Sequence, residues 1–424
     1  MKQDSRLVSK IKSQMSRFAG RLTEGEGAVE RRFVSEMLYG LQAARDVKLS
    51  EVSRSLNETI ALIKTENRLS RNLASRDRSE RINRLIAWEG AAQVGEDTVL
   101  AIDLGDVRKK YAKRMEYLAT IRDGSEKELG QGYWLCEVVG ADAYGDKITP
   151  LYGALYSADA EGFVSENDEI FRAMKTVSKA TRRRGIYAID RGGDRGKILE
   201  FAIENALSFV IRQKGDRHVL TRQGAKMPVR MAGWGCRFTE RRHVELERDG
   251  ERVKKTLKLG FREVRLPRRP ETPLWLVTIK GLAENPIFLL TNLAPRPGGA
   301  YAGWIGDIYL TRWKCEETYR FLKQAYGLED VRVRSYAALR SLYALLHAVF
   351  YFVSVILGQK AKMNLLFKKI CEKAKRFYEI ATFFQYALAD GLHRLLFTSR
   401  FKPPPPPPGP TSRQLYFDFA APPT

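Results

Sequence analysis

Cysteine and histidine are scarce in this chain, with four of each among 424 residues. The cysteines stand alone along the sequence and form no CxxC pair: Cys136, Cys236, Cys315 and Cys371. A zinc ribbon needs closely spaced Cys or His ligands, and a disulfide framework needs a denser set of cysteines, so neither is expected. The scarcity favours a reducing compartment, and we expect a cytoplasmic protein.

Long hydrophobic segments are also rare. The first 18 residues, MKQDSRLVSKIKSQMSRF, contain no apolar stretch of signal-peptide length, so export is not expected. One apolar run, residues 341–358, is just long enough to cross a membrane. Because His347 lies inside this run and charged segments flank it on both sides, we expect a buried packing helix and no membrane partner.

Acidic residues are few relative to basic ones. The chain has 73 Lys plus Arg against 50 Asp plus Glu, which gives a net charge of +23. Such an excess attracts polyanions, and nucleic acid is the commonest large one. An acidic membrane surface would also attract it, but the basic residues are spread along the chain and are not gathered beside one amphipathic helix.

Changes in composition divide the chain into four parts. Residues 1–95 are rich in Arg, Glu, Leu and Ala and predict a helical DNA-binding domain. Residues 96–335 carry the patterns of a mixed α/β domain, interrupted at about 217–297 by a β-rich, strongly basic insertion. Residues 336–400 predict a C-terminal helical region suited to dimerisation. Residues 401–424 form a proline-rich tail that is expected to be disordered or to dock a partner.

Within the N-terminal part, residues 49–74 predict two short amphipathic helices. They resemble a helix-turn-helix arrangement, with Lys64, Arg68 and Arg71 on the exposed side of the second helix. No base-reading code can be recognised from the sequence, so an ordinary basic helix bundle remains an equal alternative.

The α/β part shows a clear order of elements. Strands, helices and hairpin signals are expected at these positions: strands 99–102, 132–140 and 148–156, helix 167–183, strand 185–189, helix 197–206, strand 208–213, a hairpin turn at Asp249-Gly250, and strands 274–279 and 287–291. Three sequential strands followed by alternating helices and strands predict a mixed α/β sheet flanked by helices.

A polar set follows at helical spacing. Tyr309, Arg312, Glu316 and Lys323 have offsets of three, seven and fourteen, so they share one face of a helix that is expected to begin near Asp307. Such a face can be simply solvated. Alternatively, Glu316 can bind a metal while the cations and the phenol hold phosphate oxygens, as chemistry on a nucleic-acid backbone requires.

Two aspartates are candidate partners of Glu316. Asp103 directly follows the expected strand 99–102, and Asp190 directly follows the apolar strand that ends at Ile189. Taken singly, each is explained as a turn or helix-capping residue. Taken together with Glu316, they supply carboxylates from separate elements, which is what a site with two magnesium ions for phosphodiester attack requires.

This combination resembles a known family. Asp103, Asp190 and Glu316 match the order of the DDE triad of cut-and-paste transposases, and residues 309–323 (YLTRWKCEETYRFLK) are similar to the YREK signature of the bacterial insertion-sequence-four family. Residues 189–217 (IDRGGDRGKILEFAIENALSFVIRQKGDR) also look like the family's second catalytic block. The resemblance extends over about residues 99–346.

The resemblance implies a ribonuclease H-like core with a β-rich insertion and a transposase activity. By analogy, Asp103, Asp190 and Glu316 would bind two Mg²⁺ ions, for which Mn²⁺ can substitute. Double-stranded DNA, comprising transposon terminal inverted repeats and target DNA, would be the substrate of a homodimer in a synaptic complex. Cleavage would pass through a hairpin before strand transfer.

Roles for the basic residues also follow from this resemblance. Tyr309, Arg312 and Lys323 would hold the terminal phosphates and the hairpin. Arg212 and Lys214, at the end of the expected strand 208–213, are candidates for contact with the DNA backbone or are surface charges. A catalytically inactive relative that only binds DNA and a structure-specific nuclease are the competing functions.

Overall fold

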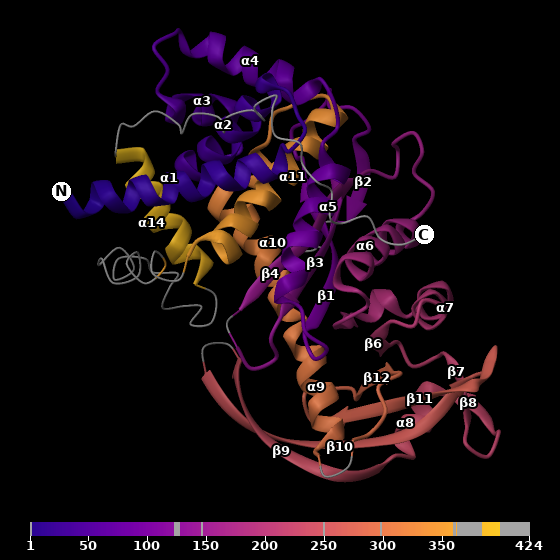
Figure 1. Ribbon diagram of the computed structural model, residues 1–424. Coiled ribbons are helices and arrows are strands. Elements are labelled where there is room, and N and C mark those ends of the chain that lie inside the picture. The colour runs from indigo at the N-terminus through magenta and orange to yellow at the C-terminus, as the bar shows by residue number, and fades with distance from the viewer. Residues whose placement is uncertain are drawn as a thin grey trace, which may run out of the picture.

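We describe a computed structural model of the chain over residues 2–122, 128–145, 147–248, 251–296, 299–358, 362 and 384–398 (Figure 1). The N-terminal region is helical, as expected from its sequence. Within residues 2–90 the helices are α1 (Lys2–Leu22), α2 (Ala28–Ala44), α3 (Leu49–Leu56), α4 (Leu62–Ala74) and α5 (Ser79–Gly90). In α1 the buried side chains recur every three or four residues, as Ile11, Met15 and Phe18 illustrate. This spacing places them on one face, which packs into the core shared with the C-terminal helices.

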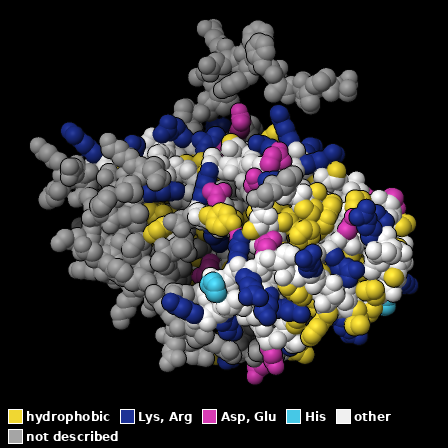
Figure 2. Space-filling view, turned by 90° about the horizontal axis from the view of Figure 1, so that it is seen from below, with side chains coloured by type: hydrophobic (Ala, Val, Ile, Leu, Met, Phe, Trp, Pro, Cys, Tyr) yellow, Lys and Arg dark blue, Asp and Glu magenta, His cyan; other side chains and the backbone are white. Residues whose placement is uncertain are grey.

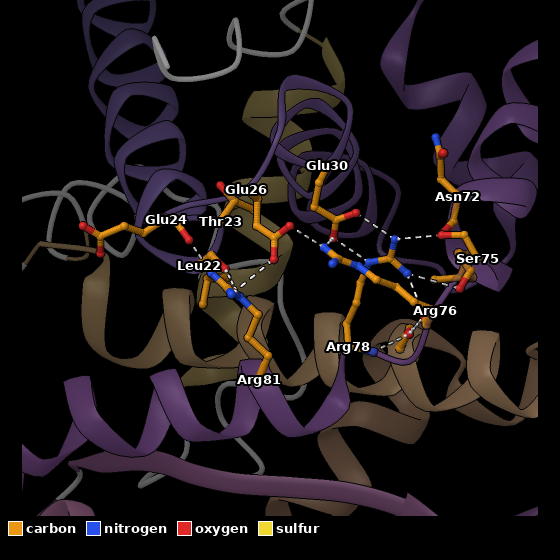
Figure 3. A network of polar contacts seen from close by, with 12 residues as sticks. Leu22, Thr23, Glu24, Glu26, Glu30, Asn72, Ser75, Arg76, Arg78 and Arg81 are labelled. Atoms are coloured by element: carbon orange, nitrogen blue, oxygen red, sulfur yellow. Dashed lines mark hydrogen bonds and ion pairs between the residues drawn. The ribbon is translucent and has the colours of Figure 1, made fainter. Parts of the chain in front are cut away.

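An ion-pair network fixes the N-terminal helices to one another (Figure 3). Arg76 Nη2 lies 2.8 Å from Glu26 Oε2, and Arg78 Nε lies 2.6 Å from Glu30 Oε1. The same turn is tied to a distant helix, because the backbone N–H of Arg78 donates to Ser341 Oγ at 3.0 Å. The N-terminal helices therefore share hydrogen bonds as well as a core with the C-terminal part of the chain.

The prediction that Lys64, Arg68 and Arg71 lie on the exposed side of the second short helix is only partly correct. Lys64 and Arg71 are exposed on α4. Arg68, in contrast, is directed at the neighbouring helices, where its guanidinium pairs with Glu36 and lies 2.8 Å from Glu58 Oε2. A half-buried cation is drawn to these carboxylates because desolvation without a partner is unfavourable. Arg68 is thus engaged within the bundle.

The strands of the described residues form one twelve-stranded sheet. Its central strands are β1 (Val99–Arg108), β3 (Leu129–Ala141), β4 (Ile148–Tyr156), β5 (Ile186–Ile189) and β6 (Ser208–Gln213). They lie in the order β4-β3-β1-β5-β6, with β3 antiparallel to both of its neighbours and β5 and β6 parallel to β1. Helices α6 (Glu166–Thr181) and α7 (Gly196–Glu204) follow β4 and β5, and the short strand β2 (Ala119–Arg122) pairs with β3. This topology is that of a ribonuclease H-like core and confirms the expected fold class.

One strand is longer than its sequence pattern suggested. The expected strand ended at Ile102, with Asp103 just after it, but β1 continues to Arg108 and pairs with β3 along its whole length. Backbone hydrogen bonds to β3 do not depend on side-chain polarity, so the ladder continues past the apolar run. Asp103 is therefore a residue within a strand and lies opposite Glu137.

The β-rich insertion extends the same sheet. Its elements are β7 (His218–Thr221), β8 (Lys226–Pro228), α8 (Val229–Trp234), β9 (Arg237–Arg248), β10 (Glu251–Leu266), β11 (Arg269–Lys280) and β12 (Ile287–Thr291). Strand β12 pairs antiparallel with β6, which joins the insertion to the core. The expected turn at Asp249-Gly250 lies outside the described residues, but the antiparallel strands on either side pair Arg248 with Glu251.

The long strands β9 and β10 curve around α9 at one end of the molecule (Figure 1). Seen from this end, Lys and Arg side chains are scattered across the surface among hydrophobic patches (Figure 2). The basic excess of the sequence is thus visible on the side of the insertion.

The polar helix face expected around Glu316 lies on two helices. The helix begins at Tyr301, earlier than the expected Asp307, and the chain divides at Arg312 into α9 (Tyr301–Thr311) and α10 (Trp313–Tyr326). The apolar run that follows lies mainly in α11 (Tyr336–Tyr351) and the π-helical turn Phe352–Ile356. Among the described residues, this segment is the one long and apolar enough to span a membrane, and 83% of its apolar window is buried inside the protein. Helix α14 (Gln385–Thr398) packs against α2, and the proline-rich tail lies outside the described residues.

Candidate active site

The two aspartates are brought together by the parallel pairing of β1 and β5. Ile102 lies opposite Ile189 in the register of these strands. Asp103 and Asp190 are the next residues on each strand, so they emerge side by side at the same edge. The fold therefore brings side by side two carboxylates that the sequence analysis took from separate elements.

Glu316 reaches the same place from α10 through a shared arginine. Arg312 Nη1 lies 3.0 Å from Asp103 Oδ2, and Arg312 Nη2 lies 2.6 Å from Glu316 Oε1. The arginine is 6% exposed. A guanidinium with two donor edges is suited to bridge two carboxylates, and its burial is tolerable because both partners are anionic.

Burial affects the pKa values of Asp103 and Arg312. It raises the pKa of Asp103 to about 7; Arg312 opposes this effect, while the nearby Asp190 and Glu316 add to it. Burial also acts to lower the pKa of Arg312, but the Asp103 and Glu316 carboxylates outweigh it and raise that pKa. The arginine is therefore charged at all ordinary pH values, whereas Asp103 changes its charge near neutrality.

Asp190 has a second role in local structure. Its Oδ1 accepts a hydrogen bond of 2.6 Å from the backbone N–H of Gly192 and so caps a short 3-10 turn, Arg191–Gly193. The capping interpretation of Asp190 is therefore correct in part, although the turn intervenes before α7 begins at Gly196. Capping engages Oδ1, and the structure records no hydrogen-bond donor at Oδ2 among the described residues.

Two supporting residues were missed in the sequence. Tyr319 donates its hydroxyl to the backbone carbonyl of Asp103 at 2.7 Å, and its ring packs so closely on Gly105 that a Cβ there would lie 3.0 Å from it. Glu137, fully buried opposite Asp103, accepts a hydrogen bond from Tyr343. The position of Tyr319 three residues after Glu316 was the one available signal, since it places both on one side of α10.

The remaining predicted residues do not share one location. Tyr309 is 3% exposed in the core beneath the insertion, where its hydroxyl accepts a hydrogen bond of 3.2 Å from Arg212 Nη1. Lys323 lies on the other side of the acids, with Nζ 3.0 Å from both Asp106 Oδ2 and Glu329 Oε1. Because α9 packs on the insertion while α10 packs on β1, residues with helical offsets in sequence face different surroundings.

Lys214 lies apart from these residues. Its side chain is exposed and borders a separate hollow, and its backbone N–H donates to Asp194 Oδ2 at 2.8 Å. Asp194 also pairs with Arg217 at 2.6 Å, so it holds the start of the insertion in place. The structure thus brings together Asp103, Asp190, Glu316 and Arg312, and leaves Lys214 outside this group.

A large hollow opens beside the acids, and we call it the basic groove. It has a volume of about 1260 Å³, and Asp103 and Glu316 lie on its wall. Nine Lys or Arg residues and five Asp or Glu residues line it. The basic ones are Arg108, Lys109, Lys110, Lys113, Arg114, Arg320, Lys323, Arg332 and Arg334. An excess of cations around a strip of acids attracts a polyanion while keeping local sites for a small cation.

The acid group was tested for its fit to a divalent metal. Three carboxylates from separate elements are the oxygen donors that Mg²⁺ and Mn²⁺ prefer. Among the described residues, however, no three Asp, Glu, His or Cys side chains are close enough together to hold a metal ion. The guanidinium of Arg312 lies between Asp103 and Glu316 and supplies positive charge there. The chemistry of the three carboxylates suits a divalent metal, but in this structure Arg312 occupies the space between Asp103 and Glu316.

Part of the chain is similar to a known protein family. The family model described as "Transposase DDE domain" matches residues 157–351, which include Asp190, Arg312 and Glu316 but begin after Asp103. No curated protein matches the chain. Among solved structures, the piggyBac transposase synaptic complex with hairpin DNA matches with a TM-score of 0.47 and 13% identity, over 92% of this chain and 78% of that chain. That likeness is too weak to carry an argument, and it is the family model that identifies residues 157–351 as similar to a transposase DDE domain.

Proposed function

We propose that the protein is a metal-dependent DNA transposase that cuts DNA at the ends of a mobile element and joins the cut ends to a target. The observation that carries this proposal is the placement of Asp103 and Asp190 on adjacent parallel strands, with Glu316 linked to Asp103 through Arg312. The match of residues 157–351 to a transposase DDE domain supports it independently.

The proposed chemistry assigns the acids to metal binding. Asp103, Asp190 and Glu316 would hold Mg²⁺ or Mn²⁺, which activates a water or a 3′ hydroxyl and stabilises the leaving oxygen of a phosphodiester. Asp103 must lose its proton to take part; burial raises its pKa to about 7 in the protein alone, and a bound cation would lower it. Tyr319 keeps the Asp103 backbone in place during this change through its hydroxyl.

Arg312 has two successive tasks in this proposal. In the protein alone it neutralises Asp103 and Glu316. With the carboxylates engaged in metal binding, the Arg312 guanidinium would be available to bind a phosphate oxygen of the DNA, an anion for which its paired donors are suited. Arg312 would then leave its position between the acids. Its observed contacts with Asp103 and Glu316 are therefore compatible with the phosphate-binding role that the YREK-type signature implies.

The finer features remain parts of the proposal. We assign residues 1–95 to DNA binding, 96–335 to catalysis and 336–400 to dimerisation in a synaptic complex, with a hairpin intermediate as the resemblance to the insertion-sequence-four family implies. Tyr309 would position Arg212 and Arg312 through its ring, since both guanidinium groups lie about 6 Å from the ring centre. Lys323 is the YREK-type cation that faces the basic groove.

The proposal is tested by cutting of duplex DNA that carries the sequences flanking the gene, in Mg²⁺, in Mn²⁺ and in EDTA. We expect nicking in both metals and none in EDTA. Asp103→Asn and Asp190→Asn should abolish nicking but retain DNA binding, because they remove metal ligands and leave the basic surfaces intact.

The matched control is Asp97→Asn, since Asp97 is an exposed aspartate paired with Arg296 outside the acid group. It should cut as the wild type does. Cutting by Asp103→Asn at the wild-type rate would contradict the site assignment. Binding without cutting by the wild type would favour an inactive DNA-binding relative, and cutting without strand transfer would favour a structure-specific nuclease.

A further inference from the structure

The loop between β1 and β2, residues 109–118, forms one wall of the basic groove. Both of its ends are anchored. Lys109 is buried, and its Nζ donates to the backbone carbonyl of Glu329 at 2.6 Å and to that of Val331. At the other end, the backbone N–H of Glu116 donates to the carbonyl of Arg334 at 3.0 Å. The loop is thus held against the segment that connects α10 to α11.

The tip of this loop presents an aromatic side chain among cations. Tyr111 is 85% exposed, more than any other large hydrophobic side chain of the described residues. Lys110 Nζ lies 5.9 Å from the centre of its ring, and Lys113 and Arg114 follow within the same exposed stretch. Exposure of a large ring is unfavourable in water unless a partner covers it, so this position is suited to stacking.

The facing wall is also basic. Arg332 and Arg334 are exposed on the connection between α10 and α11. Within the described part of the chain, no carboxylate pairs with Lys113, Arg114, Arg332 or Arg334, although surface cations elsewhere on the protein often have such partners. Like charges gathered along two walls repel one another, and a polyanion between them removes that repulsion.

We propose that the basic groove binds a DNA strand with unpaired nucleotides as it enters the acid site, a role that rests on the proposed function. Lys113, Arg114, Arg332 and Arg334 contact successive phosphates. Tyr111 stacks on an unpaired base. The strand's reacting phosphate then lies next to Asp103 and Glu316, because the groove is continuous with them.

An unpaired strand is favoured over an intact duplex by the chemistry of the tip. A base within a duplex already has both faces stacked, whereas an unpaired base offers a free face to an aromatic ring. Stacking of this kind tolerates any base, so the groove requires no sequence-reading side chains. The cations add affinity for the backbone without distinguishing sequence.

The test measures binding of the full chain to fluorescently labelled DNA in EDTA, which prevents cutting. One probe is a blunt duplex, and the other is the same duplex with a single-stranded 3′ overhang of about five nucleotides, within the site size of single-strand binders. The wild type should bind the overhang probe more tightly. Tyr111→Ala should lose about tenfold in affinity for the overhang probe and little for the blunt one.

Two further variants show whether stacking is responsible. Tyr111→Trp should retain the preference for the overhang because it keeps an aromatic face. Trp88→Ala, which removes an aromatic side chain of 52% exposure outside the groove, should bind both probes as the wild type does. Unchanged overhang binding by Tyr111→Ala would overturn the inference, as would an equal loss on both probes.

The phosphate contacts are tested by salt dependence. Lys113→Ala combined with Arg114→Ala should reduce the slope of log affinity against log salt for the overhang probe by about 1.4, or about 0.7 for each lost contact to a single strand. The control is Lys179→Ala combined with Lys197→Ala, which removes the same charge from exposed positions on α6 and α7. A control slope that falls as much as the groove variant's would show that the effect is general and contradict the site.

This inference and the proposed function fail in different ways. If the wild type binds the overhang through Tyr111 but cuts no DNA, the groove assignment stands and the transposase proposal falls. If the wild type cuts DNA and Tyr111→Ala shows wild-type overhang binding, the groove assignment alone is wrong.

Discussion

Charged side chains are arranged differently at the two ends of the basic groove. At the inner end, Asp103 and Glu316 are partly or largely buried and share Arg312, so anions and cation neutralise one another inside the protein. On the outer walls, Lys113, Arg114 and Arg332 are exposed and have no carboxylate partner among the described residues. Charges that the protein neutralises itself contribute to folding, whereas charges left to solvent are available for a ligand.

This difference suggests how the inner end is prepared for reaction. Arg312 stabilises a cluster of acids that would otherwise repel one another, and in the proposed function a divalent metal would supply a larger positive charge there. The outer cations need no such exchange, because no carboxylate of the described residues pairs with them. The following variants break or sharpen this contrast, beginning with the largest expected effect.

Removing the buried arginine should be severely destabilising. Arg312→Ala leaves Asp103 and Glu316 without their shared cation, so the free energy of unfolding at pH 8 should fall by about 3 kcal/mol. Arg320→Ala, on α10, loses only the more exposed pair with Glu317 and should cost less than about 1 kcal/mol. Urea unfolding of both variants in EDTA measures the difference. Equal losses would contradict the distinction between buried and exposed pairs.

The buried acid behind the site should make stability depend on pH. Burial raises the pKa of Glu137 to about 8, so the folded protein retains this proton while the unfolded chain loses it above its usual pKa. Stability from this group is therefore lost as pH rises from about 4.5 to 8. Glu137→Gln lacks this titrating group. Its free energy of unfolding, relative to that of the wild type, should therefore be higher at pH 8 than at pH 5 by roughly 2 kcal/mol.

The control for this titration is the exposed Glu96→Gln, whose stability should follow the wild type at every pH. Thermal unfolding across pH 5 to 8 gives the comparison. A Glu137→Gln curve parallel to the wild type would show that the Glu137 carboxyl is charged in the folded protein.

Loss of one hydroxyl beneath the acids should have a smaller effect. Tyr319→Phe removes the hydrogen bond to the Asp103 carbonyl and should lower stability by about 1 kcal/mol. It should also raise the Mg²⁺ concentration needed for half-maximal cutting, because Asp103 is less firmly positioned. Tyr111→Phe removes an exposed hydroxyl and should change neither value. An unchanged metal requirement in Tyr319→Phe would show that its role is limited to packing.

The outer wall should tolerate substitution best. Lys113→Ala and Arg114→Ala each remove an exposed cation that no carboxylate of the described residues contacts, so the free energy of unfolding should stay within about 0.5 kcal/mol of wild type. Urea unfolding at low salt would reveal a larger effect. A loss above this range would mean that these side chains support the loop and are not kept for a ligand.

The sequence predicted the order of the core strands because the patterns of apolar residues that define strands are local. The apolar run that ends at Ile189 and the acid after it define β5 and Asp190, and β4 and β6 have the predicted bounds. The predicted end of β1 was wrong because backbone hydrogen bonds to β3 extend the strand past Asp103. The pattern of side chains does not encode that pairing.

Contacts between residues that are far apart in the chain could not be predicted from the sequence. Helical spacing places Tyr309 and Lys323 in line with Arg312, but it gives no information about the division of the helix at Arg312 or about what each half packs against. Arg68 likewise shows an exposed pattern on its own helix, and only the approach of Glu36 and Glu58 turns it inward. The supporting roles of Glu137 and Tyr319 depend on how β3 and α10 pack beside Asp103, which the sequence pattern does not specify.

The most direct test of the central claim compares two neighbouring glutamates on α10. Glu316 faces Arg312 and the acids, whereas Glu317 pairs with Arg320. In Mg²⁺, Glu316→Gln should cut duplex carrying the flanking sequences at less than about one hundredth of the wild-type rate, since it removes a metal ligand. Glu317→Gln should cut at a rate close to the wild type. Wild-type cutting by Glu316→Gln would contradict the assignment of Asp103, Asp190 and Glu316 as the metal-binding acids.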